Sequence, residues 1–134
     1  MQEGVIIKGI GGFYYVDTAV GVYECRARGK FRIKNITPLI GDRVKIEGDA
    51  GSLQGYIIEI LERKNQLVRP TVANIDLAII VFAARKPNIN NALMQRFLVY
   101  SEYKKLNAVV CINKIDLDKE GHYLDIVRML ETVP

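Results

Sequence analysis

Three polar residues in the second half of the chain have the types and the spacing of a base-recognition site. Asn113, Lys114 and Asp116 follow an apolar run and precede a stretch that we expect to be helical. Guanine presents two neighbouring N–H donors, and one ionised carboxylate can accept both, which is the role predicted for Asp116. The wrong base would leave this carboxylate unpaired. Lys114 would cover the base with its methylene groups, and Asn113 would hold the loop.

A helix cap is the other interpretation of the same stretch. Asp116 or Asp118 could accept N–H groups at the start of the next helix, where Asp is common. The sequence INKID also matches the NKxD element of GTP-binding proteins, which follows a strand and precedes a helix. The spacing alone leaves both interpretations open.

A second candidate site lies in residues 25–34, CRARGKFRIK, where every second side chain is basic. The five cations are Arg26, Arg28, Lys30, Arg32 and Lys34. An extended chain would place all of them on one face, because successive side chains of a strand point to opposite sides. Cations this close repel one another, so we predict that a polyanion, RNA, binds here. A solvated strand face is the alternative.

The composition is that of an ordinary soluble domain: 134 residues, 49% hydrophobic and 25% charged, with a net charge of +4. The sequence has neither an apolar run of about 20 residues nor a secretory leader, so we predict a cytoplasmic protein that does not span a membrane. Cys25 and Cys111 are predicted to be reduced, structural thiols, with no disulfide and no metal site. We assign no chemistry to His122.

Residues 1–68 are predicted to form a small all-β barrel of the oligonucleotide-binding (OB) type. Short alternating segments separated by turn residues predict five strands, at residues 4–10, 13–17, 22–28, 42–48 and 55–61. The sequence GIGG at residues 9–12 is predicted to be a hairpin turn. No window predicts a helix, so the basic segment is expected at the end of the third strand and in the loop after it. A small SH3-like barrel is the competing fold.

Residues 69–134 are predicted to form a second domain with the order β-α-β-α. Its strands are expected at residues 75–84 and 107–113, and its helices at about 90–105 and 119–132. Continuous apolar strands joined by a helix indicate a parallel sheet that is buried on both faces. One face of the first helix is predicted to pack on this sheet, namely Leu93, Phe97, Tyr100 and Tyr103.

The order of short motifs along the chain resembles that of the RsgA/YjeQ family of circularly permuted GTPases. The motifs are RGKFR at 28–32, GDRV at 41–44, RKN at 63–65, RPTVANID at 69–76, KP at 86–87, RFL at 96–98 and NKIDL at 113–117. Each motif is weak alone, whereas their order is specific and covers nearly the whole chain. The resemblance implies an OB barrel followed by the first β-α-β-α part of an α/β P-loop-type GTPase domain.

The resemblance also implies a function, which is late maturation of the small (30S) ribosomal subunit. The barrel would bind this subunit and its 16S rRNA through the basic segment from Arg28 to Lys34, with no DNA or membrane as partner. GTP with Mg²⁺ would be bound by the complete protein, with Asn113, Lys114 and Asp116 recognising the base. Zinc is implied for a further domain at the C-terminus of the family, which this chain lacks.

One departure from the family pattern limits what this chain is expected to do. Its 134 residues contain no GxxxxGK[ST] motif, which would hold the phosphates. We therefore predict that these residues are the front portion of a longer GTPase and do not hydrolyse GTP by themselves. The alternative is a free-standing OB-fold module that binds RNA and has no nucleotide chemistry.

Overall fold

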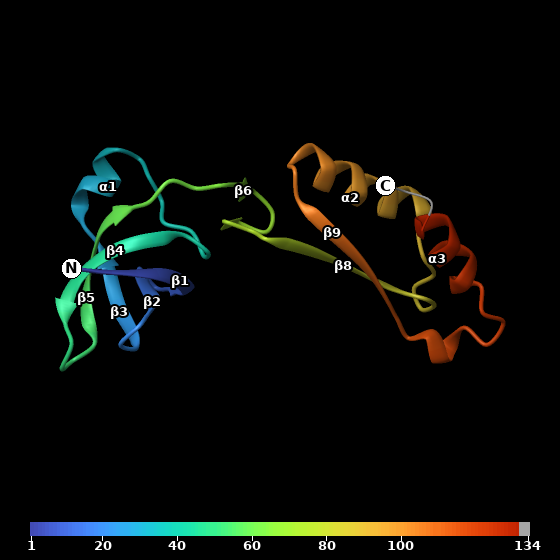
Figure 1. Cartoon of the computed structure of the whole chain (residues 1–134), viewed down its shortest axis with the longest axis horizontal. Helices are drawn as coiled ribbons and strands as arrows, with labels where there is room; N and C mark the ends of the chain where they lie inside the picture. The colour runs from blue at the N-terminus through green and yellow to red at the C-terminus, as the bar shows by residue number, and fades with distance from the viewer. Residues whose placement is uncertain (132–134) are drawn as a thin grey trace. The chain divides into compact units, whose positions relative to one another are not determined.

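The computed structural model describes residues 1–131, with the side chain of Arg32 left out. The chain divides into two compact units, Met1–Ile75 and the residues from Asp76 onward. Figure 1 shows a small barrel in the first unit, and two strands with helices in the second.

The first unit is a closed barrel of five strands: β1 (Gln2–Ile10), β2 (Phe13–Thr18), β3 (Val22–Ala27), β4 (Arg43–Asp49) and β5 (Gln54–Ile60). The order around the barrel is β1-β2-β3-β5-β4, and β4 pairs with β1 to close it. All pairs are antiparallel except β3 with β5, which is parallel. The predicted OB-type barrel is therefore confirmed. Its first hairpin turns through Gly11 and Gly12, both at positive φ, as a two-residue hairpin loop requires.

The barrel core is formed by inward-facing side chains of the five strands and by one side chain from outside them, Phe31. Its buried members are Ile6, Val16, Tyr23, Cys25, Phe31, Val44, Ile46 and Ile57. Burial raises the pKa of the Cys25 thiol to about 11, so this group stays protonated at neutral pH. Cys111, by contrast, is exposed.

The connection between β3 and β4 differs from the prediction. Its first part is a short helix, α1 (Gly29–Ile33), and not an extended segment. Phe31 points from this helix into the barrel core and is 6% exposed. Five helical residues are too few to show a helical period in the sequence, so only the burial of Phe31 against distant strands reveals the helix. The five cations of the basic segment therefore do not share one strand face.

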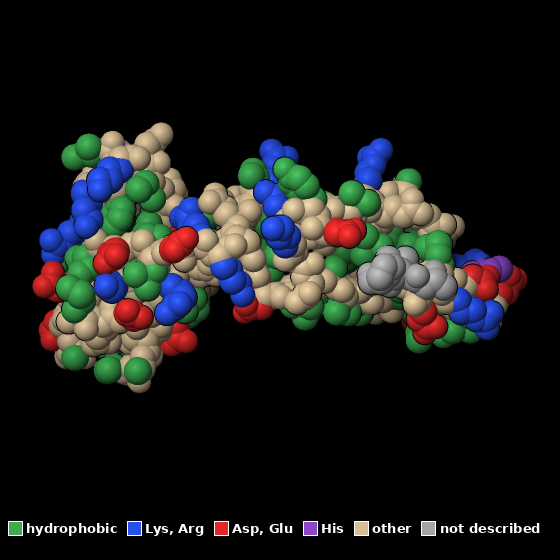
Figure 2. Space-filling view, turned by 45° about the horizontal axis from the view of Figure 1, so that its top comes forward, with side chains coloured by type: hydrophobic (Ala, Val, Ile, Leu, Met, Phe, Trp, Pro, Cys, Tyr) green, Lys and Arg blue, Asp and Glu red, His purple; other side chains and the backbone are tan. Residues whose placement is uncertain are grey.

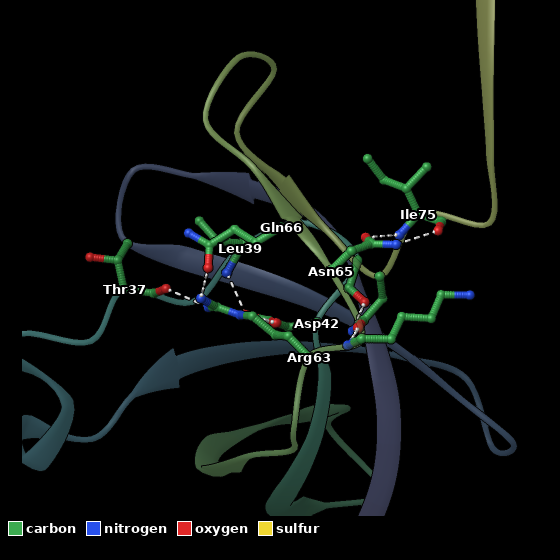
Figure 3. Close-up of polar contacts among 10 residues, drawn as sticks. Thr37, Leu39, Asp42, Arg63, Asn65, Gln66 and Ile75 are labelled. Atoms are coloured by element: carbon green, nitrogen blue, oxygen red, sulfur yellow. Dashed lines mark hydrogen bonds and ion pairs between the residues drawn. The ribbon is translucent and has the colours of Figure 1, made fainter. Parts of the chain in front are cut away.

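A buried ion pair connects the loop before β4 to the chain after β5 (Figure 3). The Asp42 side chain is fully buried, and its carboxylate accepts hydrogen bonds from Nε and Nη2 of Arg63, both at 2.7 Å. It also accepts one from the Leu39 N–H at 2.8 Å. Arg63 donates further to the carbonyl of Thr37 and to the side chain of Gln66. The neighbouring carboxylate of Asp42 raises the pKa of Arg63, which stays charged.

Two asparagines continue this attachment along the linker, which contains the short strands β6 (Gln66–Leu67) and β7 (Val72–Ala73). The side-chain oxygen of Asn65 accepts a hydrogen bond from the N–H of Ile75, and the side-chain nitrogen donates one to the Ile75 carbonyl, each at 2.7 Å. The Asn74 amide accepts from the N–H of Lys64 and donates to the carbonyl of Gly41. A side chain at Gly41 would clash with the carbonyl oxygen of Ala73, and its φ of +96° also favours glycine. The linker is therefore held on the barrel by specific polar contacts.

The second unit has two parallel strands, β8 (Leu77–Ala83) and β9 (Asn107–Asn113), in the predicted order with its helices. The helices are α2 (Asn91–Tyr103), a 3-10 turn η1 (Ile115–Leu117) and α3 (Tyr123–Glu131). The predicted end of the last helix at residue 132 lies outside the described residues. Within residues 1–131, no helix combines the length and the apolar character that crossing a membrane requires.

Two details of the second unit correct the predictions. One face of the sheet is open, as the exposure of Ile79 (63%) and Val81 (59%) shows. The described helices cover only the opposite face. On α2, the buried residues are Met94 and Ser101, two turns apart. Of the four residues predicted to pack on the sheet, Phe97 contacts the ring of Phe82 on β8, with 6.2 Å between the ring centres, whereas Leu93, Tyr100 and Tyr103 are exposed. Ser101 is small and satisfies its hydroxyl with the carbonyl of Phe97, so it can face the sheet without an unpaired polar group.

We expect the Arg63→Ala substitution to lower the free energy of unfolding by about 3–5 kcal/mol, because the Asp42 carboxylate would remain buried without its partner. Arg43→Ala is the matched control, since its ion pair with Glu3 is long, at 3.7 Å, and exposed on both sides. The control should lose less than about 1 kcal/mol. Urea unfolding of both variants measures the difference. Equal losses would contradict a structural role for the buried pair.

Candidate functional site

The candidate base-recognition residues lie where β9 ends. Asn113 is the last residue of β9, and its carbonyl accepts a hydrogen bond from the N–H of Ala84, just after β8, at 2.7 Å. Lys114 then takes a left-handed conformation, with φ of 59°, and turns the chain into η1. The carboxyl ends of both parallel strands therefore meet at one edge, the place where such sheets bind ligands.

Asn113 and Lys114 both make contacts that hold this edge. The Asn113 side-chain oxygen accepts a hydrogen bond from the N–H of Lys114 at 2.8 Å. The Lys114 ammonium donates to the carbonyl of Lys86 at 3.1 Å, in the loop between β8 and α2. Lys114 thereby connects the turn after β9 to the loop after β8.

Asp116 and Asp118 have different environments, although they are only two residues apart. Asp118 is 4% exposed, and its Oδ2 accepts the N–H of Tyr123, the first residue of α3, at 2.8 Å. Its Oδ1 lies 3.6 Å from Nε of Arg85. Asp116 is exposed, and within residues 1–131 its carboxylate has no hydrogen bond or ion pair. Asp118 is therefore the residue that caps α3, and the Asp116 carboxylate is free to accept donors from a ligand.

The five cations of the basic segment lie on β3, on α1 and in the turns at the two ends of α1. Arg26 lies on the outer face of β3, where its guanidinium carbon is 4.6 Å from the centre of the Phe13 ring. Arg28 makes an ion pair with Glu47 at 2.8 Å. Lys30 and Lys34 are exposed on and just after α1, and the side chain of Arg32 is outside the described part. Figure 2 shows Lys and Arg side chains along the edge of the barrel that carries α1.

A groove of about 730 Å³ on the barrel adds residues that the sequence analysis did not select as sites. Phe13 and Tyr56 line it together with Arg26 and the Gly11–Gly12 turn. Tyr56 is 51% exposed, and it could have been found from the alternation of β5, because its neighbour Ile57 faces the core.

Within the part of the chain that the structure describes, no three His, Cys, Asp or Glu side chains come together as a metal site requires.

The closed barrel and the polar edge of the parallel sheet define a two-part protein, an OB-type barrel joined to the beginning of a GTPase-type α/β domain. Comparison with known families then identifies the particular family. The family described as RsgA N-terminal domain matches residues 3–57, and the family described as RsgA GTPase matches residues 60–133. The chain belongs to the RsgA family, which confirms the resemblance noted in the sequence.

Curated relatives carry the name small ribosomal subunit biogenesis GTPase RsgA. The protein of this name from Caldanaerobacter subterraneus is 50% identical over 131 residues, which are 98% of this chain and 44% of the relative. The one from Clostridium beijerinckii is 51% identical over 132 residues, 98% of this chain and 45% of the relative. The chain thus spans less than half the length of these relatives.

Two solved structures share the fold. One is described as YloQ, a circularly permuted GTPase, with a TM-score of 0.79 and 41% identity over 97% of this chain and 46% of that one. The other is YjeQ from Thermotoga maritima, with a TM-score of 0.82 and 35% identity over 98% of this chain and 48% of that one. Both likenesses extend over the barrel and the second unit.

The different environments of the two aspartates lead to a test. Asp118→Ala should lower the free energy of unfolding by about 1 kcal/mol, because the first N–H of α3 loses its acceptor. Asp116→Ala should leave stability unchanged within about 0.5 kcal/mol, because its carboxylate is exposed. Urea unfolding followed by circular dichroism measures both. If Asp116→Ala were the more destabilising change, the helix-cap interpretation would apply to Asp116.

Proposed function

We propose that this chain is the front portion of a GTPase that acts in late maturation of the small (30S) ribosomal subunit in the cytoplasm. The barrel, up to about residue 68, binds the 16S rRNA of that subunit. Residues 69–134 begin the GTPase domain and recognise the base of GTP. Membership of the RsgA family and the names of its relatives support this assignment.

The observation that carries the nucleotide assignment is the free carboxylate of Asp116 at the end of β9. Because Asp118 already caps α3, Asp116 has no structural partner to lose when a base binds. It can accept the N1–H and the exocyclic amine of guanine together. Lys114 covers the base plane with its methylene groups, and Asn113 supports the turn in which both residues lie.

Catalysis of hydrolysis would require groups that these 134 residues do not contain. The sequence has no GxxxxGK[ST] element, which in P-loop proteins cradles the phosphates and helps to bind Mg²⁺. We therefore propose that this chain contributes base selectivity and RNA binding, and that phosphate chemistry depends on the remainder of a longer protein.

Guanosine should bind this chain without phosphates and shift the backbone NMR signals of Asn113, Lys114 and Asp116 in a titration. Adenosine at equal concentration should not, because it lacks the pair of N–H donors. Asp116→Asn should transfer the preference to xanthosine, whose C2 carbonyl can accept from the new amide. Equal shifts with guanosine and adenosine would contradict base recognition and favour the barrel as a free-standing RNA-binding module.

RNA binding through the basic segment should depend steeply on salt, since each phosphate contact contributes about 0.7–0.9 to the slope of log K against log salt. The triple change of Arg28, Lys30 and Arg32 to alanine should flatten this slope for binding to purified small subunits. The control removes three exposed cations of the second unit, Arg96, Lys119 and Arg128. If both triple variants bound with the same slope as the unchanged chain, the basic segment would be a solvated face.

A further inference from the structure

Three side chains form a row across the outside of the barrel. Phe13 on β2 is directly opposite Arg26 on β3, and Arg26 is directly opposite Tyr56 on β5. Paired residues point to the same side of a sheet, and the neighbouring pair Tyr14 and Cys25 faces the core. Phe13, Arg26 and Tyr56 therefore lie side by side on the outer surface, and we call them the outer row.

The two rings of the outer row are not used by the core. Tyr56 is half exposed, and Phe13 is not part of the core cluster. Each ring instead has a guanidinium near it: Arg26 lies 4.6 Å from the centre of the Phe13 ring, and Arg28 lies 5.9 Å from the centre of the Tyr56 ring. Arginine beside a flat aromatic surface is an arrangement that serves both to stack a base and to attract its phosphate.

Hollows on both sides of the outer row leave space for a ligand. The first hollow, of about 730 Å³, extends from the row to the Gly11–Gly12 turn, α1 and the loop at residues 35–38. The second hollow, of about 550 Å³, extends over β3, β4 and β5. Phe13, Arg26 and Tyr56 line both, so a flat group stacked on the row would occupy either one.

The charges of the two hollows differ, and this difference selects one of them. Among the described residues, the lining of the first hollow has no acidic side chain, and the Lys30 ammonium lies 5.3 Å from the centre of the Phe31 ring, which is part of that lining. The second hollow is lined by Glu24, Glu47 and Asp49, which repel phosphate. A nucleic-acid backbone would therefore pass over the first hollow, with its base on the outer row.

We propose that the outer row stacks an unpaired nucleotide of RNA in the first hollow. The inference rests on the proposed RNA-binding function and goes further, because it names the state of the RNA and the residues that distinguish it. A paired base has both faces covered by its neighbours in the helix, so it cannot lie on an aromatic side chain. The barrel should accordingly prefer single-stranded RNA to duplex RNA of equal length.

The test measures binding of a fluorescein-labelled oligouridine, and of a blunt RNA duplex of the same length, to the 134-residue chain. Phe13→Ala and Tyr56→Ala should each weaken binding to the single strand by about fivefold or more. The slope of log K against log salt should stay the same, since no phosphate contact is lost. Tyr15→Ala is the matched control, because Tyr15 is on the same outer face of β2 but lines neither hollow.

Two further measurements keep the outcomes distinct. Phe13→Leu and Tyr56→Leu retain apolar volume without a flat ring, so they test stacking if an alanine variant does not fold. Duplex binding as tight as single-strand binding, or an equal loss from Tyr15→Ala, would overturn stacking while leaving salt-dependent RNA binding intact. Absence of binding to any RNA would overturn both the stacking site and the proposed RNA-binding function of the barrel.

Discussion

The first unit depends on one buried carboxylate. Asp42 has no access to solvent, and an ionised group in that position requires several donors to replace its hydration. Arg63 provides two of them and the Leu39 backbone provides a third. Because Arg63 follows β5 and Asp42 precedes β4, this contact fixes the linker on the barrel, and the asparagine contacts continue it to Ile75. The linker is therefore held on the barrel as far as Ile75, the last residue of the first unit.

A second buried carboxylate has a comparable role at the edge of the parallel sheet. Asp118 accepts the first N–H of α3, and its capping function leaves Asp116 without a structural task. Two aspartates separated by one residue are thus divided by burial into a structural acceptor and an exposed one. The same division occurs on the barrel, where Glu47 pairs with Arg28, while Arg26 lies against an aromatic ring. In both places the pairing of charges, and not their number, determines which groups are open to a ligand.

Much of the fold could be predicted because it depends on local patterns. Alternation of apolar residues predicts the barrel strands, the Gly11–Gly12 pair predicts the first hairpin, and the apolar runs predict β8 and β9. The failures concern packing between distant segments. Phe31 is buried by strands far from it in the chain, so α1 was missed. On α2, Met94 and Ser101 are the buried residues, and of the predicted apolar stripe only Phe97 makes a ring contact with the sheet among the described residues.

By itself, the sequence determined the order of the elements, the polar triplet at the end of β9 and the presence of a dense basic segment. These follow from residue type and spacing, which are local properties. Only the tertiary structure decided that the basic residues are divided between β3, α1 and the turns beside α1. It also decided that Phe13 and Tyr56 lie beside Arg26, and that Asp118 rather than Asp116 caps α3. The reason is physical: burial and ion pairing depend on which residues meet in space, and neighbouring residues in the chain do not specify that.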